Sequence, residues 1–133
     1  MLKAMAGIAL GEHDKELAQL KRRVPAADYA VFAEPGRLRA FGTTIRECMR
    51  QGTRGAVWDM RLDVREFGFR LDEICTPLKW FHGEQDMNSP VALARKVIAE
   101  LPHAKLQTYA NEAHLSTLCN HFDEIARALR EPA

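Results

Sequence analysis

The stretch Pro77–Asp86, with the sequence PLKWFHGEQD, constrains the fold more than any other part of the chain. Its bulky residues predict a short strand that ends in a turn at Gly83 and presents the carboxylate of Asp86 just past its carboxyl end. A second strand-like run, Lys105–Tyr109, is followed by His114. Open α/β sheets bind their ligands at the carboxyl ends of the strands. Two parallel strands would therefore bring Asp86 and His114 to the same edge of the sheet.

Residues 90–101, between the two strands, carry the clearest helical pattern of the chain. Apolar side chains recur there at the spacing of one helix face, and charged ones lie opposite. Because a strand, a helix and a second strand form a right-handed βαβ unit, the sequence predicts an α/β fold. A last helix is expected over about residues 116–130. Its buried side chains are expected to be Leu118, Phe122, Ile125, Ala126 and Leu129.

The order of these residues resembles the C-terminal third of an α/β-hydrolase. The usual family pattern is an aliphatic strand, His-Gly, two variable positions and Asp, followed later by Gly-His. His82, Gly83 and Asp86 fit this pattern, and His114 follows in the expected order. Ala113 precedes it where the family usually has glycine. A further departure is the charged residue Lys79, in a strand that is normally apolar throughout.

The resemblance covers residues 66–129 well and residues 1–65 only loosely. It implies a partial α/β-hydrolase fold in one compact unit, with a helical cap-like segment over 1–65 and the C-terminal part of the core over 66–133. The patterns in the first segment predict helices over about 13–23 and 38–49, which would equally suit a generic helical pair. Glycines at 52 and 55 are expected to end the second helix. The apolar residues between 55 and 69 alternate with charges, which predicts an edge strand or an extended crossing.

The resemblance also implies roles for Asp86 and His114. In such a site the aspartate accepts the Nδ1 proton of the histidine and fixes its tautomer, and the histidine acts as general base and then general acid. The residues themselves leave two simpler interpretations open. Asp86 could only tighten its turn, as aspartate often does, and His114 could be a solvated loop histidine. His82, at the end of its strand, is expected to make a structural hydrogen bond.

A nucleophile is the missing part of this pattern. The family carries it on a Gly-x-Ser-x-Gly turn upstream of the cap, and the chain contains no such motif. Its two serines are Ser89, which precedes Pro90 and is predicted to cap a helix, and Ser116, which lies just past His114. Neither is expected on a strand-to-helix elbow. We therefore expect the cap and C-terminal half of a hydrolase, without the nucleophile-bearing half and without activity on its own.

Composition excludes several other classes of function. A net charge of +1 gives no electrostatic surface for nucleic acid, and no apolar run approaches the roughly 20 residues that span a bilayer. Three cysteines without metal or redox spacing predict reduced thiols in a cytoplasmic protein. The histidines and acids show no metal-motif spacing, so neither a metal nor another cofactor is expected.

Two functions remain open at this stage. The first is a serine hydrolase that acts on an ester or similar bond of a small molecule once a nucleophile is supplied. The alternative is a non-catalytic, self-associating remnant or assembly module of the same fold. In either case a strand with one hydrogen-bonded neighbour leaves an open edge. We expect a homo-oligomer or a complementary N-terminal chain to contact residues 76–82.

Overall fold

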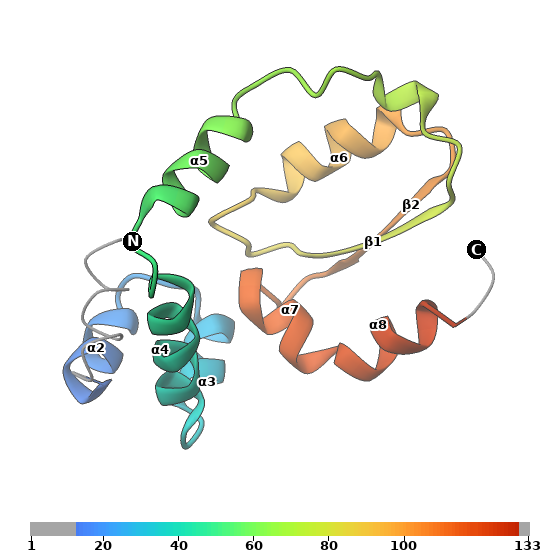
Figure 1. The fold of residues 1–133 in the computed structure, drawn as a ribbon. Coiled ribbons are helices and arrows are strands. Elements are labelled where there is room, and N and C mark those ends of the chain that lie inside the picture. Colours follow the sequence, from blue (N-terminus) through green and yellow to red (C-terminus); the bar gives the residue numbers. More distant parts are fainter. Residues whose placement is uncertain (1–12, 131–133) are drawn as a thin grey trace.

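Two parallel strands, β1 (Leu78–Gly83) and β2 (Ala104–Tyr109), form the sheet of this protein in a computed structural model that describes residues 13–130 (Figure 1). Leu78 lies opposite Ala104, and Gly83 lies opposite Tyr109. The crossover helix α6 (Val91–Glu100) lies on one side of the sheet, and α7 (His114–Asn120) and α8 (Phe122–Ala128) lie on the other. The predicted strand, helix and parallel strand are confirmed, and the chain is a mixed α/β protein.

Lys79 has a structural partner inside this architecture. Its Nζ donates to the carbonyl oxygen of Ala128 at the end of α8, over 3.4 Å. A cation is favourable at a helix C-terminus because the last carbonyls lack partners within the helix. A lysine in β1 therefore ties the strand to α8.

The N-terminal helices form a small core of their own. The helices are α2 (His13–Leu20), α3 (Ala26–Ala33) and α4 (Arg37–Cys48). Leu20, Phe32 and Leu38 are buried between them, and Leu115 of α7 packs against this cluster. The helical segment is thus anchored to the element that begins with His114. Both predicted N-terminal helices are present, although the first ends at Leu20.

The segment after α4 differs from the prediction. Residues Arg54–Leu62 form the helix α5, so the predicted edge strand or extended crossing is wrong. Arginine, alanine, methionine and leucine are strong helix formers, and they outweighed the short alternation of apolar and charged residues. Gly55 lies inside α5 instead of ending α4. Past this helix, a 3₁₀ turn, η1 (Leu71–Glu73), leads the chain into β1.

The predicted last helix is two helices, α7 and α8, which meet at His121. His121 leaves helical geometry, with φ −116° and ψ 20°, and its ring stacks on Tyr109 of β2 with 3.8 Å between centroids. Because the helix is broken there, the apolar positions of the two halves no longer lie on one continuous face. Leu118, Phe122 and Leu129 are 50%, 61% and 85% exposed, so their predicted burial is wrong.

None of the helices described is long and apolar enough to cross a membrane.

Candidate functional site

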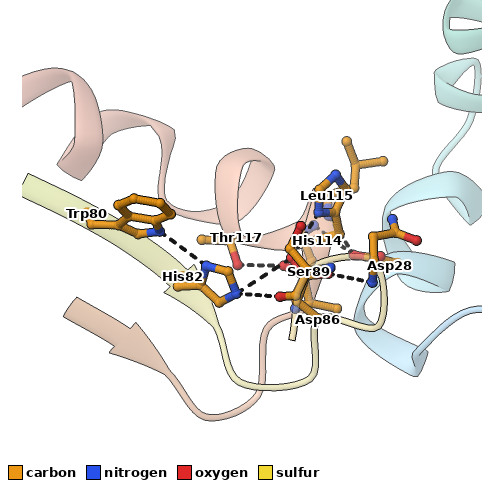
Figure 2. Close-up of polar contacts among 11 residues, drawn as sticks. Asp28, Trp80, His82, Asp86, Ser89, His114, Leu115 and Thr117 are labelled. Atoms are coloured by element: carbon orange, nitrogen blue, oxygen red, sulfur yellow. Dashed lines mark hydrogen bonds and ion pairs between the residues drawn. The ribbon is translucent and has the colours of Figure 1, made fainter. Parts of the chain in front are cut away.

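Asp86 and His114 meet at the carboxyl ends of the two strands (Figure 2). Asp86 lies in the turn after β1, and His114 is the first residue of α7. The Oδ2 atom of Asp86 is 2.9 Å from Nδ1 of His114. This distance lies within the hydrogen-bonding range of about 2.6–3.2 Å for an acid–base pair. The expected proximity of the two side chains is therefore observed.

Asp86 also organises its own turn. Its Oδ1 atom accepts hydrogen bonds from the backbone N–H groups of Asn88 and Ser89, each at 2.8 Å. Asp86 is 8% exposed, so these hydrogen bonds take the place of nearly all contacts between its carboxylate and water. Turn tightening and contact with His114 were alternative interpretations of the sequence. In the fold they use different oxygens of one carboxylate.

The ionisation of Asp86 follows from this arrangement. Burial works to raise the pKa of its carboxyl group, but hydrogen bonds from the backbone of Ser89, from His114 and from the backbone of Asn88 outweigh it. The net result is a pKa below the ordinary value of an aspartate. Asp86 is therefore a carboxylate at neutral pH and can accept a hydrogen bond from the Nδ1–H group of His114.

Two hydrogen bonds hold the ring of His82, next to Asp86, in one tautomer. The indole N–H of Trp80 donates to its Nδ1 atom over 3.2 Å, and an indole can only donate. Nδ1 of His82 is therefore unprotonated, and Nε2 donates to the carbonyl oxygen of Ser89 over 2.8 Å. The expected structural hydrogen bond of His82 is confirmed. It fixes Ser89, whose N–H in turn holds Asp86.

The ring of His114 is engaged through Nδ1 with Asp86, and the side chain as a whole is half exposed. With Nδ1 donating to the carboxylate of Asp86, a neutral ring keeps the lone pair on Nε2. The side chain is 52% exposed. A cavity of about 390 Å³ lies beside the pair, with Trp80 and Phe81 of β1 and Leu118 of α7 among its lining residues. A half-exposed histidine, the carboxylate bonded to it and an apolar wall are thus adjacent.

Close contact between two backbones makes this geometry possible. A Cβ atom at Gly83 would lie 2.5 Å from the carbonyl oxygen of Glu112 and 2.6 Å from that of Ala113. The N–H of Gln85 donates to Glu112 across the same gap, over 2.9 Å. Ala113 itself is completely buried with φ −123°, which any residue can adopt. The glycine usual in the family at that position is therefore unnecessary here.

Neither serine is placed as a nucleophile. Ser116 lies inside α7, is 0% exposed, and accepts the N–H of Ala113 on its Oγ atom over 2.7 Å. Ser89 lies in the loop that joins β1 to α6, six residues past the end of the strand, and not on a sharp turn directly after it. Its predicted capping role is wrong, because Pro90 occupies the N-cap position and no side chain caps the helix.

Sequence reasoning missed Asp28. This residue of α3 is 5% exposed, and its Oδ1 atom accepts the backbone N–H groups of Leu115 and Ser116, each over 2.9 Å. Leu115 and Ser116 follow Asp28 in the sequence by 87 and 88 residues, respectively. A single acid within the apolar run AADYAVFA was the one available signal, and it does not identify a partner.

A second group of titratable side chains surrounds His121. Its Nε2 is 3.4 Å from Glu112, and its Nδ1 is 3.3 Å from Glu124. Burial and a hydrogen bond to Glu124 raise the pKa of the neighbouring Tyr109 to about 12. Over residues 13–130, no three His, Cys, Asp or Glu side chains gather in a way that would hold a metal ion. This group fastens α8 to β2.

No protein-family model, curated protein or solved structure matches the chain.

Proposed function

We propose that this chain carries the acid–base half of a serine hydrolase site of the α/β-hydrolase type, for an ester or similar bond of a small molecule. The observation that supports it is the 2.9 Å contact between Asp86 Oδ2 and His114 Nδ1 at the carboxyl ends of two parallel strands. Ligand sites of open α/β sheets lie at that edge. The buried, ionised acid and the half-exposed histidine suit an orienting residue and a base, respectively.

In the proposed mechanism His114 Nε2 removes the proton of a nucleophilic hydroxyl and later delivers it to the leaving group. Asp86 stays ionised, holds the ring in the Nδ1–H tautomer and stabilises the imidazolium that forms. The hydroxyl comes from another polypeptide segment placed beside β1. Because neither Ser89 nor Ser116 is positioned for that role, residues 13–130 alone do not complete the reaction.

The tautomer of His114 provides the test. Nitrogen-15 NMR of the neutral ring is expected to show a protonated Nδ1 and a free Nε2 in the wild type. In Asp86→Asn the side-chain oxygen still accepts from the backbone amides of Asn88 and Ser89, and the side-chain NH₂ group faces His114. That group can only donate, so Nδ1 of His114 must become the hydrogen-bond acceptor. The variant is expected to shift His114 to the Nε2–H tautomer while the amides of Asn88 and Ser89 stay protected. A wild-type ring with protonated Nε2 would refute the proposed orientation.

The same samples are expected to hydrolyse small activated esters no faster than His114→Ala. Turnover that is lost in His114→Ala would reveal a nucleophile within the chain. In that case Ser89→Ala would show whether the exposed serine supplies it, since the buried Ser116 is already committed to the backbone of Ala113.

A non-catalytic assembly module is the second candidate, and the exposed apolar surface favours it. No residue of α5 is buried, and large side chains of this helix and the segment after it are open to solvent. Trp58 is 52%, Met60 62% and Phe67 68% exposed. In the part of the chain described, β1 pairs only with β2, which leaves an open edge. A second copy of the chain, or a complementary N-terminal chain, would cover both features.

Sedimentation velocity at micromolar concentration is therefore expected to show a dimer or larger species. Because the association uses strand edges and apolar surface, His114→Ala should leave it unchanged. A stable, folded monomer would contradict this expectation and would remove the main support for the assembly candidate.

A further inference from the structure

Helix α7 begins without a capping side chain of its own. The first N–H groups of a helix lack partners within the helix and are usually satisfied by a Ser, Thr, Asp or Asn at the N-cap. Ala113 occupies that position and offers no side-chain acceptor. Ser116 satisfies only the N–H of Ala113 itself, over 2.7 Å. The N–H groups of the next residues in the first turn need an acceptor from elsewhere.

Asp28 supplies this acceptor from a different helix. Its Oδ1 atom receives the N–H groups of Leu115 and Ser116 at 2.9 Å each, and the residue is 5% exposed (Figure 2). Its negative charge also lies at the positive end of the α7 dipole. Leu115 is anchored in addition by the apolar cluster of α2–α4. Asp28 therefore caps α7 across a tertiary interface.

The two capped amides directly follow His114 in the chain. The position of the His114 backbone is therefore set by the same turn that Asp28 closes. Among residues 13–130 the hydrogen-bond partner of the His114 side chain is Asp86, and the side chain is 52% exposed, so the position of its backbone bears directly on the geometry of the pair. A displacement of about 1 Å between His114 and Asp86 can remove much of the catalytic advantage of a preorganised pair. The position of the α7 backbone therefore affects the proposed acid–base function.

We propose that Asp28 is a positioning residue, which holds His114 in line with Asp86 by capping α7 from α3. This inference rests on the proposed acid–base function of the pair. The hydrogen bonds of the Asp28 carboxylate go to the backbone of Leu115 and Ser116 and not to His114 or Asp86. Asp28 therefore acts through the first turn of α7. It makes the geometry of the base depend on the docking of the N-terminal helices.

The test compares Asp28→Ala with Asp28→Asn. Asparagine keeps an acceptor oxygen of the same reach and is an equally good cap, whereas alanine removes it at a cost of about 1 kcal/mol. In Asp28→Ala, exchange of the Leu115 and Ser116 amides is expected to rise about fivefold, which is that energy converted. The fraction of neutral His114 in the Nδ1–H tautomer should fall below half. Asp28→Asn should retain wild-type behaviour in both measurements.

Asp123→Ala is the matched control, because Asp123 is an exposed acid in the first turn of α8. It should change neither measurement at His114. An Asp28→Ala protein that keeps the wild-type His114 tautomer would overturn the proposal, and so would an Asp28→Asn protein that loses it. If Asp28→Ala does not fold, Asp28→Ser shortens the acceptor arm and is read in the same way. The wild-type tautomer tests the proposed function, whereas the difference between variants tests Asp28.

Discussion

Gly83→Ala is expected to lower the free energy of unfolding by about 3 kcal/mol, at the upper end of the cost of overpacking. The added Cβ would lie 2.5 Å and 2.6 Å from two backbone carbonyl oxygens, of Glu112 and Ala113. Backbone atoms cannot rotate away as a flexible side chain can. The turn after β1 must therefore separate from the loop before α7, which moves Asp86 away from His114. Urea unfolding gives the stability, and the His114 Nδ1 proton signal reports the lost contact.

Gly55→Ala is the control for this substitution. A Cβ at Gly55 meets nothing within 4 Å, and the residue lies inside α5. Alanine is favoured over glycine in the middle of a helix by about 0.5–1 kcal/mol, and Gly55 lies in the first turn of α5, so this variant should be at least as stable as the wild type. If Gly83→Ala matched the stability of the wild type, the close approach of the two backbones would be wrong.

The elements that the sequence predicts well are those with short-range patterns. β1, α6 and β2 each carry their own periodicity and a terminating residue, and the βαβ rule joins them into a parallel pair. The meeting of Asp86 and His114 follows from that topology. The resemblance to α/β-hydrolases added roles for these residues, and those roles remain a proposal.

The elements that the sequence predicts poorly depend on contacts between distant residues. The break between α7 and α8 falls at His121, whose ring stacks on Tyr109 of a distant strand. The role of Asp28 depends on helix amides 87 and 88 residues away. Within α5, a short alternation of apolar and charged residues favours a strand, whereas the helix propensities of the same residues favour a helix. None of these residues is buried, so the alternation does not correspond to one buried and one exposed face. These three features depend on the tertiary arrangement and therefore cannot be predicted from local sequence patterns.

Asp86 should contribute far more to stability than His114, although both belong to the same proposed site. Asp86→Ala leaves the N–H groups of Asn88 and Ser89 without their acceptor, which is a buried carboxylate. A hydrogen bond to a charged group contributes about 1.5–3 kcal/mol, and water can replace part of the two that are lost because Asn88 and Ser89 are exposed, so a loss of about 2–4 kcal/mol is expected. His114→Ala removes one hydrogen bond of a half-exposed side chain and should cost under about 1 kcal/mol.

The difference between wild type and Asp86→Ala should also depend on pH. The folded-state pKa of Asp86 is lowered from its ordinary value of 3.8, so the carboxylate stabilises the fold above that pH. As the pH falls below 3.8 and through the lower folded-state value, protonation of Asp86 removes this contribution. Urea unfolding at neutral pH and near pH 3 should therefore show a smaller difference between the two proteins in acid. A difference that grows as the pH falls would mean that the buried carboxyl group is stabilised as the neutral acid, which is incompatible with its holding the Nδ1 proton of His114.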